Sequence, residues 1–150
     1  GCLIRVDSAA NANETLLQFQ DAAGQALGSI TGNPSSNTAA YGTSSDYRLK
    51  ENVVYDWSAL DRLNQLKPAR YNFIGDDNTV DGFIAHELQA VMPEVVIGDK
   101  DAVKEEDGVE VPDYQGVAIS KLVPLLVKSV QELSAKVDTL EAEIEVLRNG

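Results

Sequence analysis

Cysteine, histidine, tryptophan and methionine each occur only once in this chain of 150 residues. The single cysteine, Cys2, excludes an intrachain disulfide framework, and one Cys with one His excludes zinc sites built from several such residues. Aromatic residues make up only 6% of the chain, so one large core is not expected. A small chain of this kind often gains its stability by associating with other copies.

Basic charge is also scarce, because 12 Lys and Arg stand against 24 Asp and Glu, for a net charge of −12. Nucleic acid is therefore not an expected partner, since phosphate binding needs clusters of basic side chains. No apolar run reaches the roughly 18 residues of a membrane helix, so no membrane partner is expected either. There is no Gly-rich phosphate loop, and the acidic segments 76–78 and 99–101 lack the length and final Glu of a calcium loop. We expect no cofactor and no metal.

Hydrophobic residues still make up 43% of the chain, which is ordinary for a folded protein. The pattern along the first 46 residues favours short strands at 3–6, 15–19 and 26–30, with a turn at 21–24. Residues 32–46 are mainly Gly, Asn, Pro, Ser, Thr and Ala, a composition that predicts an exposed or extended loop.

From Tyr47 onward the pattern is that of a mixed, globular α+β segment. Ser58 is placed to cap a short helix over 58–66, and Pro68 ends it. The remaining expected elements are strands at 69–73, 80–85 and 95–97, a turn at 75–78, a helix of about two turns over 86–92, and a hairpin or loop over 98–110.

The last third of the chain carries an unbroken heptad pattern that begins at Ile119. Its apolar residues recur with spacings of four and three, which is the periodicity of a coiled coil. The a positions are Val123, Val130, Val137 and Ile144, and the d positions are Ile119, Leu126, Leu133, Leu140 and Leu147. Pro124 falls in the first turn if Ser120 caps the helix, and proline is tolerated there.

Two alternatives remain open for this helix. Its apolar stripe can pack against the globular part of its own chain, although a strict a/d stripe is narrower than the usual face of a globular helix. If it forms a coiled coil, β-branched residues at a with Leu at d favour two parallel strands.

The junction between the predicted loop and the globular segment contains Ser45 and Lys50, and no other lysine has a serine five positions before it. A serine hydroxyl becomes a nucleophile when a base removes its proton, and a neutral lysine can be that base. Burial or a neighbouring cation such as Arg48 favours the neutral form of a lysine. The spacing alone is more often that of an ordinary turn leading into a strand. His86 offers a Ser–His pairing, although a lone histidine is more often structural.

Four stretches taken together are identifiable as a family motif set: 45–52, 63–73, 82–96 and 114–132. They resemble the intramolecular-chaperone peptidase family found at the C-termini of phage endosialidases, tail fibres, tailspikes and neck appendages. The likeness covers about residues 40–148. The resemblance implies a short β-rich shaft end over 1–44, a mixed α/β chaperone head over 45–117, and a long helix over 118–150 that forms a parallel trimeric coiled coil.

The resemblance further implies a homotrimer, in place of the two strands that the heptads alone favour. It implies autoproteolytic cleavage between Ser44 and Ser45, with Ser45 as nucleophile and Lys50 as its base. Asp46, Arg48, Asn52 and His86 are candidates for supporting roles. The upstream fibre shaft would be both folding client and substrate, the fibre would belong to the virion tail and host attachment, and the chaperone part would be released in the host cytoplasm.

Three other functions stay open at this stage. The first is a trimerisation and adhesion module that does not cleave. The second is a regulatory domain that releases an upstream DNA-binding factor, which the non-basic, β-like residues 1–44 disfavour. The third is a binding module for a nucleotide or glycan.

Overall fold

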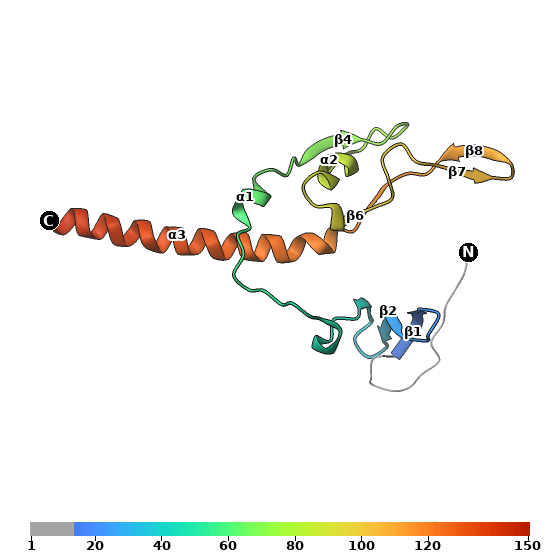
Figure 1. Cartoon of the computed structure of the whole chain (residues 1–150), viewed down its shortest axis with the longest axis horizontal. Helices are drawn as coiled ribbons and strands as arrows, with labels where there is room; N and C mark the ends of the chain where they lie inside the picture. Colours follow the sequence, from blue (N-terminus) through green and yellow to red (C-terminus); the bar gives the residue numbers. More distant parts are fainter. Residues whose placement is uncertain (1–13) are drawn as a thin grey trace. The chain divides into compact units, whose positions relative to one another are not determined.

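The computed structural model describes residues 14–150, which fall into two compact units: a first that ends at Val54 and a second from Tyr55 to Gly150. The expected strand at 3–6 and Cys2 lie outside the described residues. In the first unit, three antiparallel strands lie side by side in chain order (Figure 1). They are β1 (Glu14–Gln20), β2 (Ala26–Asn33) and β3 (Thr38–Thr43), followed by a 3-10 turn, η1 (Tyr47–Leu49).

The first two of these strands and the turn between them confirm the sequence predictions. Asp21 closes the turn, because its carboxylate accepts hydrogen bonds from the backbone N–H groups of Ala23 and Gln25. Gly24 takes a φ of 79°, a left-handed conformation that suits glycine. Strand β2 is longer than predicted, since it continues to Asn33.

The prediction of a loop over 32–46 is wrong for half of its length, because β3 lies inside it. Asn33 begins a tight turn, where its side-chain oxygen accepts from the N–H groups of Ser35 and Ser36. The chain then returns along β2 in an unbroken register, from Asn33 opposite Thr38 to Gly28 opposite Thr43. Pairing with β2 therefore outweighs a local composition that is poor in strand formers.

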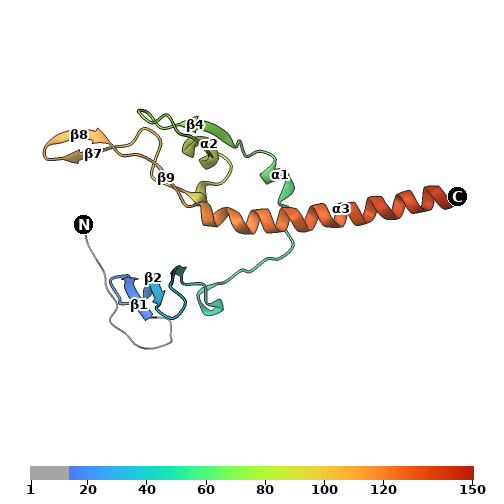
Figure 2. The same ribbon diagram turned by 180° about the vertical axis from the view of Figure 1, so that it is seen from behind.

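The second unit is a small mixed head followed by one long helix (Figures 1 and 2). Its strands form two-stranded antiparallel ladders, β4 with β5, β6 with β9, and β7 with β8. The head consists of α1 (Leu60–Leu63), β4 (Ala69–Asn72), β5 (Thr79–Gly82), α2 (Ala85–Gln89), η2 (Pro93–Val95), β6 (Val96–Ile97), β7 (Val103–Glu106), β8 (Val109–Pro112), β9 (Gly116–Val117) and η3 (Ile119–Leu122). The long helix α3 (Val123–Asn149) follows the head. The fold is α+β with small sheets, as predicted.

The hairpin expected over 98–110 is present as β7 and β8. Asp107 and Gly108 form its two-residue turn, with φ of 52° and 79°. Positive φ at both central residues is the conformation that Asp-Gly pairs adopt in tight hairpins. The expected strand at 80–85 is shorter, because the chain turns into α2 after Ile84.

The predicted cap of the first helix is wrong. α1 begins at Leu60 rather than Ser58, and no side chain of its own segment caps it. Glu132 of α3 does so instead, since its two carboxylate oxygens accept from the N–H groups of Ala59 and Leu60 at 2.7 and 3.0 Å. A long-range cap of this kind leaves no local sequence signal. Ser120 likewise does not cap α3, although Pro124 lies in its first turn as predicted.

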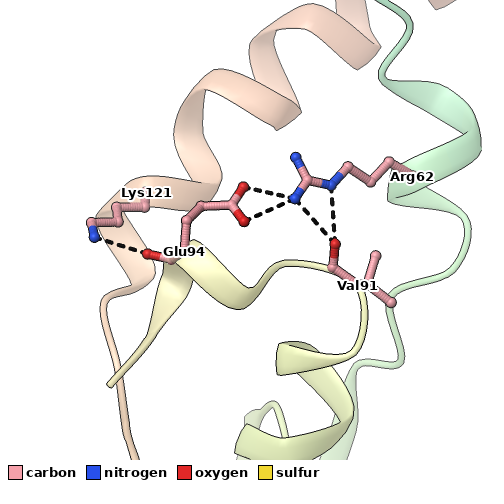
Figure 3. A network of polar contacts seen from close by, with 4 residues as sticks. All are labelled: Arg62, Val91, Glu94 and Lys121. Carbon is pink, nitrogen blue, oxygen red and sulfur yellow. Dashed lines mark hydrogen bonds and ion pairs between the residues drawn. The ribbon is translucent and has the colours of Figure 1, made fainter. Parts of the chain in front are cut away.

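The core of the second unit lies where α3 meets the head. Its buried apolar residues are Ala59, Leu60, Leu88, Met92, Val95, Leu122 and Leu125. A polar network at the edge of this core connects three segments (Figure 3). Arg62 of α1 donates to the carbonyl of Val91 and to the carboxylate of Glu94, and Lys121 of η3 donates to the carbonyl of Glu94. These bonds fix the helices that surround the core.

Helix α3 uses one face for the head and leaves another uncovered. Leu125 and Ser129 of α3 are buried where the helix meets the head, beside Leu122 at the end of η3, and none of the three is an a or d residue. The a and d residues within α3 are all between 47% and 81% exposed. The heptad stripe therefore does not pack on its own globular part, and that alternative is wrong.

Candidate functional site

Ser45 and Lys50, singled out by the family resemblance together with their spacing, lie in direct contact. The Lys50 Nζ donates to the Ser45 Oγ at 2.6 Å. The 3-10 turn η1 brings them together, because the N–H groups of Leu49 and Lys50 bond back to the carbonyls of Asp46 and Tyr47. A serine hydroxyl in hydrogen-bond contact with an amine is the arrangement that proton transfer requires.

Asp46 and Arg48 organise this turn. Asp46 caps η1 by accepting from the Arg48 N–H at 2.9 Å, and it also binds the Arg48 guanidinium through both carboxylate oxygens, at 2.8 and 3.0 Å. The pairing lowers the pKa of Asp46 and raises that of Arg48, chiefly through the side-chain hydrogen bonds between them. The positive charge of Arg48 is thus paired with Asp46, rather than unpaired beside Lys50.

On the other side of the serine, Ser44 is fixed to strand β2. Its N–H donates to the carbonyl of Leu27 at 3.3 Å, and its hydroxyl donates to the carbonyl of Ala26 at 2.7 Å. The peptide bond between Ser44 and Ser45 therefore lies between an anchored strand end and a capped turn. No local sequence signal predicts this anchor, because its partners are backbone carbonyls of a strand far upstream, one of them 18 residues away.

The two remaining candidate residues are Asn52 and His86. Asn52 has a φ of 53° and sets the chain direction shortly after Lys50. His86 is exposed on α2 in the second unit, where it lines a cavity of about 370 Å³ with Asp99, Lys100 and Asp101 among others. Within the first unit, the structure thus brings Ser45, Asp46, Arg48 and Lys50 together in one turn, directly after Ser44 at the strand end, whereas His86 belongs to the second unit.

The turn is open to solvent in the single chain. Ser45 and Lys50 are exposed, and so are two apolar neighbours, Tyr47 at 81% and Leu49 at 63%. Within residues 14–150, no three or more His, Cys, Asp or Glu side chains are grouped so as to hold a metal ion. The helices of the same part of the chain include none with the length and hydropathy to cross a membrane.

Comparison with known proteins assigns the family. Residues 45–97 match the family model described as chaperone of endosialidase. The chain carries a domain of this family. The match begins at Ser45 itself, the serine that contacts Lys50.

Two phage proteins are similar to this chain over a longer stretch. Over 105 residues, 67% of the chain, it is 33% identical to the long tail fiber protein Gp37 of Enterobacteria phage K3 and to that of Enterobacteria phage T2. The chain spans only 8% and 7% of the length of these relatives. These matches support the resemblance to the chaperone domains of phage tail fibres.

Proposed function

We propose that residues 45–150 are an intramolecular chaperone that trimerises and aligns a phage tail fibre, then releases itself by cutting the Ser44–Ser45 bond. In this scheme residues 1–44 belong to the end of the fibre shaft, 45–117 are the chaperone head and 118–150 are the coiled-coil helix. The observation that carries the proposal is the 2.6 Å contact between the Lys50 Nζ and the Ser45 Oγ, at the residue where the family match begins.

The proposed reaction starts with attack of the Ser45 Oγ on the carbonyl carbon of Ser44, while the neutral Lys50 amine takes the hydroxyl proton. The C–N bond then breaks, and Lys50 returns the proton to the freed amine of Ser45. The product is an ester that links the Ser44 acyl group to the Ser45 Oγ. Water hydrolyses this ester to a Ser44 carboxylate and restores the hydroxyl. Attack on the residue's own peptide bond is favoured because nucleophile and target are covalently adjacent.

The trimer is proposed from the uncovered face of α3. Its a and d residues are between 47% and 81% exposed in the single chain, and a heptad stripe of this kind is buried when parallel helices pair. The family resemblance favours three chains over the two that the heptads favour. Between chains, Lys136 at g faces Glu141 at e, and Glu143 at g faces Arg148 at e, so charge pairs flank the seam.

Assembly of the subunits also provides a way to exclude water from the exposed Ser45 and Lys50. A lysine acts as a base most readily where water is excluded. The exposed side chains of Tyr47 and Leu49 provide apolar surface beside the dyad, and such surface commonly marks a contact site. We propose that a neighbouring subunit covers this turn, so that cleavage follows trimer formation.

A chaperone of this design solves a problem of chain registry. Long-range β pairing between chains is slow, and three separate shafts can pair out of register. A coiled coil raises the effective concentration of the three shafts and aligns them in register. Cleavage after shaft closure then makes assembly irreversible. The mature fibre would belong to the virion tail, where the similar Gp37 proteins are named as long tail fibres, and the chaperone would remain in the host cytoplasm.

The test is denaturing mass spectrometry of the freshly expressed chain. We expect two fragments divided between Ser44 and Ser45, and an intact chain from both Ser45→Ala and Lys50→Ala. Ser58→Ala and Lys67→Ala are matched controls outside the turn and should cleave like the wild type. Added hydroxylamine should trap the ester as a hydroxamate on Ser44.

Normal cleavage in either dyad variant would contradict the assignment. An intact wild-type trimer would instead favour a second function, a trimerisation and adhesion module that does not cleave. That alternative is supported by the names of the two relatives, which describe fibre proteins, and by the exposure of both dyad residues in the single chain.

A further inference from the structure

The bond between Ser44 and Ser45 continues a β-ladder. Strand β3 pairs with β2 up to Thr43, which lies opposite Gly28. Ser44 extends this pairing by one residue, because its N–H donates to the carbonyl of Leu27 at 3.3 Å. Its hydroxyl adds a bond to the carbonyl of Ala26 at 2.7 Å. Strand β2 therefore holds the residue that supplies the carbonyl, whereas η1 holds the serine and lysine.

We propose that strand β2 is a positioning element of the cleavage reaction, and that Ser44 determines specificity through its hydroxyl. The reaction then proceeds only when the β2–β3 pair is folded, which makes cleavage a check on the fold of the segment that the chaperone leaves behind. This inference rests on the proposed autoproteolysis.

The physical reason is that cleavage needs the Ser44 carbonyl carbon within reach of the Ser45 Oγ and correctly oriented. Without the two bonds to β2, rotation about the backbone of Ser44 spreads this carbonyl over many orientations. The contacts of Asp46 and Lys50 restrain only the residues that follow the bond. Anchoring both sides keeps the reacting groups close to their reactive arrangement, which is how proximity accelerates a reaction.

The glycines of this sheet provide a matched pair of variants. A Cβ added at Gly28 would lie 2.7 Å from the backbone oxygen of Gly42, so β2 and β3 must move apart just before Ser44. A Cβ added at Gly42 would come no closer than 3.8 Å, to the Ser29 Oγ, which is ordinary contact. Gly28→Ala disturbs the anchor, whereas Gly42→Ala makes the same chemical change in the same ladder without disturbing it.

The side chain of Ser44 is tested by a second pair, Ser44→Thr and Ser44→Val, which have the same shape. Ser44 lines a cavity of about 160 Å³, so an added methyl group has space. Only threonine keeps the hydroxyl that bonds to the carbonyl of Ala26. Because one hydrogen bond contributes about 1 kcal/mol, we expect Ser44→Val to cleave roughly two- to tenfold more slowly than Ser44→Thr.

The experiment follows the cleaved fraction of the full chain over time, with native mass spectrometry reporting assembly. We expect Gly28→Ala to slow cleavage at least about tenfold, through loss of both anchoring bonds, and Gly42→Ala to match the wild type. Ser44→Thr should restore most of the rate that Ser44→Val loses, in trimers of equal yield.

Equal rates for Ser44→Thr and Ser44→Val, or a wild-type rate for Gly28→Ala, would overturn the role of β2 while leaving the dyad intact. Cleavage that persists in Ser45→Ala would instead overturn the proposed function itself. The two failures are therefore distinguishable.

Discussion

At the level of single residues, two carboxylates cap the first turns of short helices. Asp46 caps a turn within its own segment, whereas Glu132 caps α1 from a helix more than 70 residues away. Both have a pKa below the ordinary value, mainly because of the hydrogen bonds they accept. Each bond favours the ionised carboxylate, so both contacts depend on pH.

Glu132 gives a prediction for acid stability. Its pKa in the folded state is lowered from 4.5, first by the hydrogen bond from Leu60 and then by that from Ala59. A lowered folded-state pKa means that its contribution to stability is present above about pH 4.5 and is lost as pH falls through the folded value. We expect Glu132→Gln to lower the melting temperature at pH 7, and this difference from the wild type to shrink towards pH 3.

The control for this prediction is Asp138→Asn, an exposed carboxylate on the same helix, which should leave the acid profile unchanged. Thermal unfolding followed by circular dichroism at several pH values measures the effect. A difference that stays constant between pH 7 and pH 3 would show that the ionised carboxylate is not what stabilises α1.

Sequence reasoning at this scale singled out Ser45 and Lys50, which lie in contact, but not the groups that surround them. Ser45 and Lys50 carry chemistry in their side chains, so their spacing was visible and the motif around them was specific. The anchors of Ser44 and the cap by Glu132 involve backbone groups and distant partners. Such bonds depend on which segments meet in space, and a single sequence does not reveal that.

At the level of elements, the strongest sequence periodicity gave the most accurate prediction. The heptads correctly predicted a long helix whose stripe faces away from its own head. Strand β3 was missed because its residues are exposed and, apart from Tyr41, small, and its pairing with β2 supplies the stability that its own composition lacks. Short elements such as β6 and β9 are similarly defined by their partners.

The seam of α3 leads to an element-level prediction. Leu140 is a d residue, 56% exposed in the single chain, and an aspartate there would place three charges together at the centre of a trimeric coil. We expect Leu140→Asp to shift the assembly from trimer to monomer, measured by native mass spectrometry. Val146→Asp is the matched control, because Val146 is 72% exposed but lies off the seam. Equal loss of trimer in both variants would contradict the assigned seam.

At the level of the whole molecule, little apolar surface is buried in the single chain. None of the described residues 14–54 is buried, and the second unit buries seven apolar side chains. Large exposed apolar residues occur in both units, among them Tyr41, Tyr114 and Ile74. Folds with so small a core usually depend on further association for stability.

This dependence predicts a melting temperature that changes with protein concentration. Association stabilises the folded state by mass action, so a hundredfold increase in concentration should raise the melting temperature by roughly several degrees. Scanning calorimetry of Ser45→Ala, in which the chain stays intact, measures this. The same variant with Leu140→Asp added should melt at a constant temperature. A constant melting temperature in Ser45→Ala alone would argue for a stable monomer.

The separate faces of α3 have a consequence for the order of assembly. Leu125 and Ser129 contact the head, whereas the a and d residues of α3 stay exposed, so packing on the head and pairing between helices do not compete for the same side chains. The head of a subunit can therefore fold before the subunit associates with another. In the proposed assembly, association is then an encounter between folded subunits, whose rate rises with the concentration of chains and falls sharply on dilution.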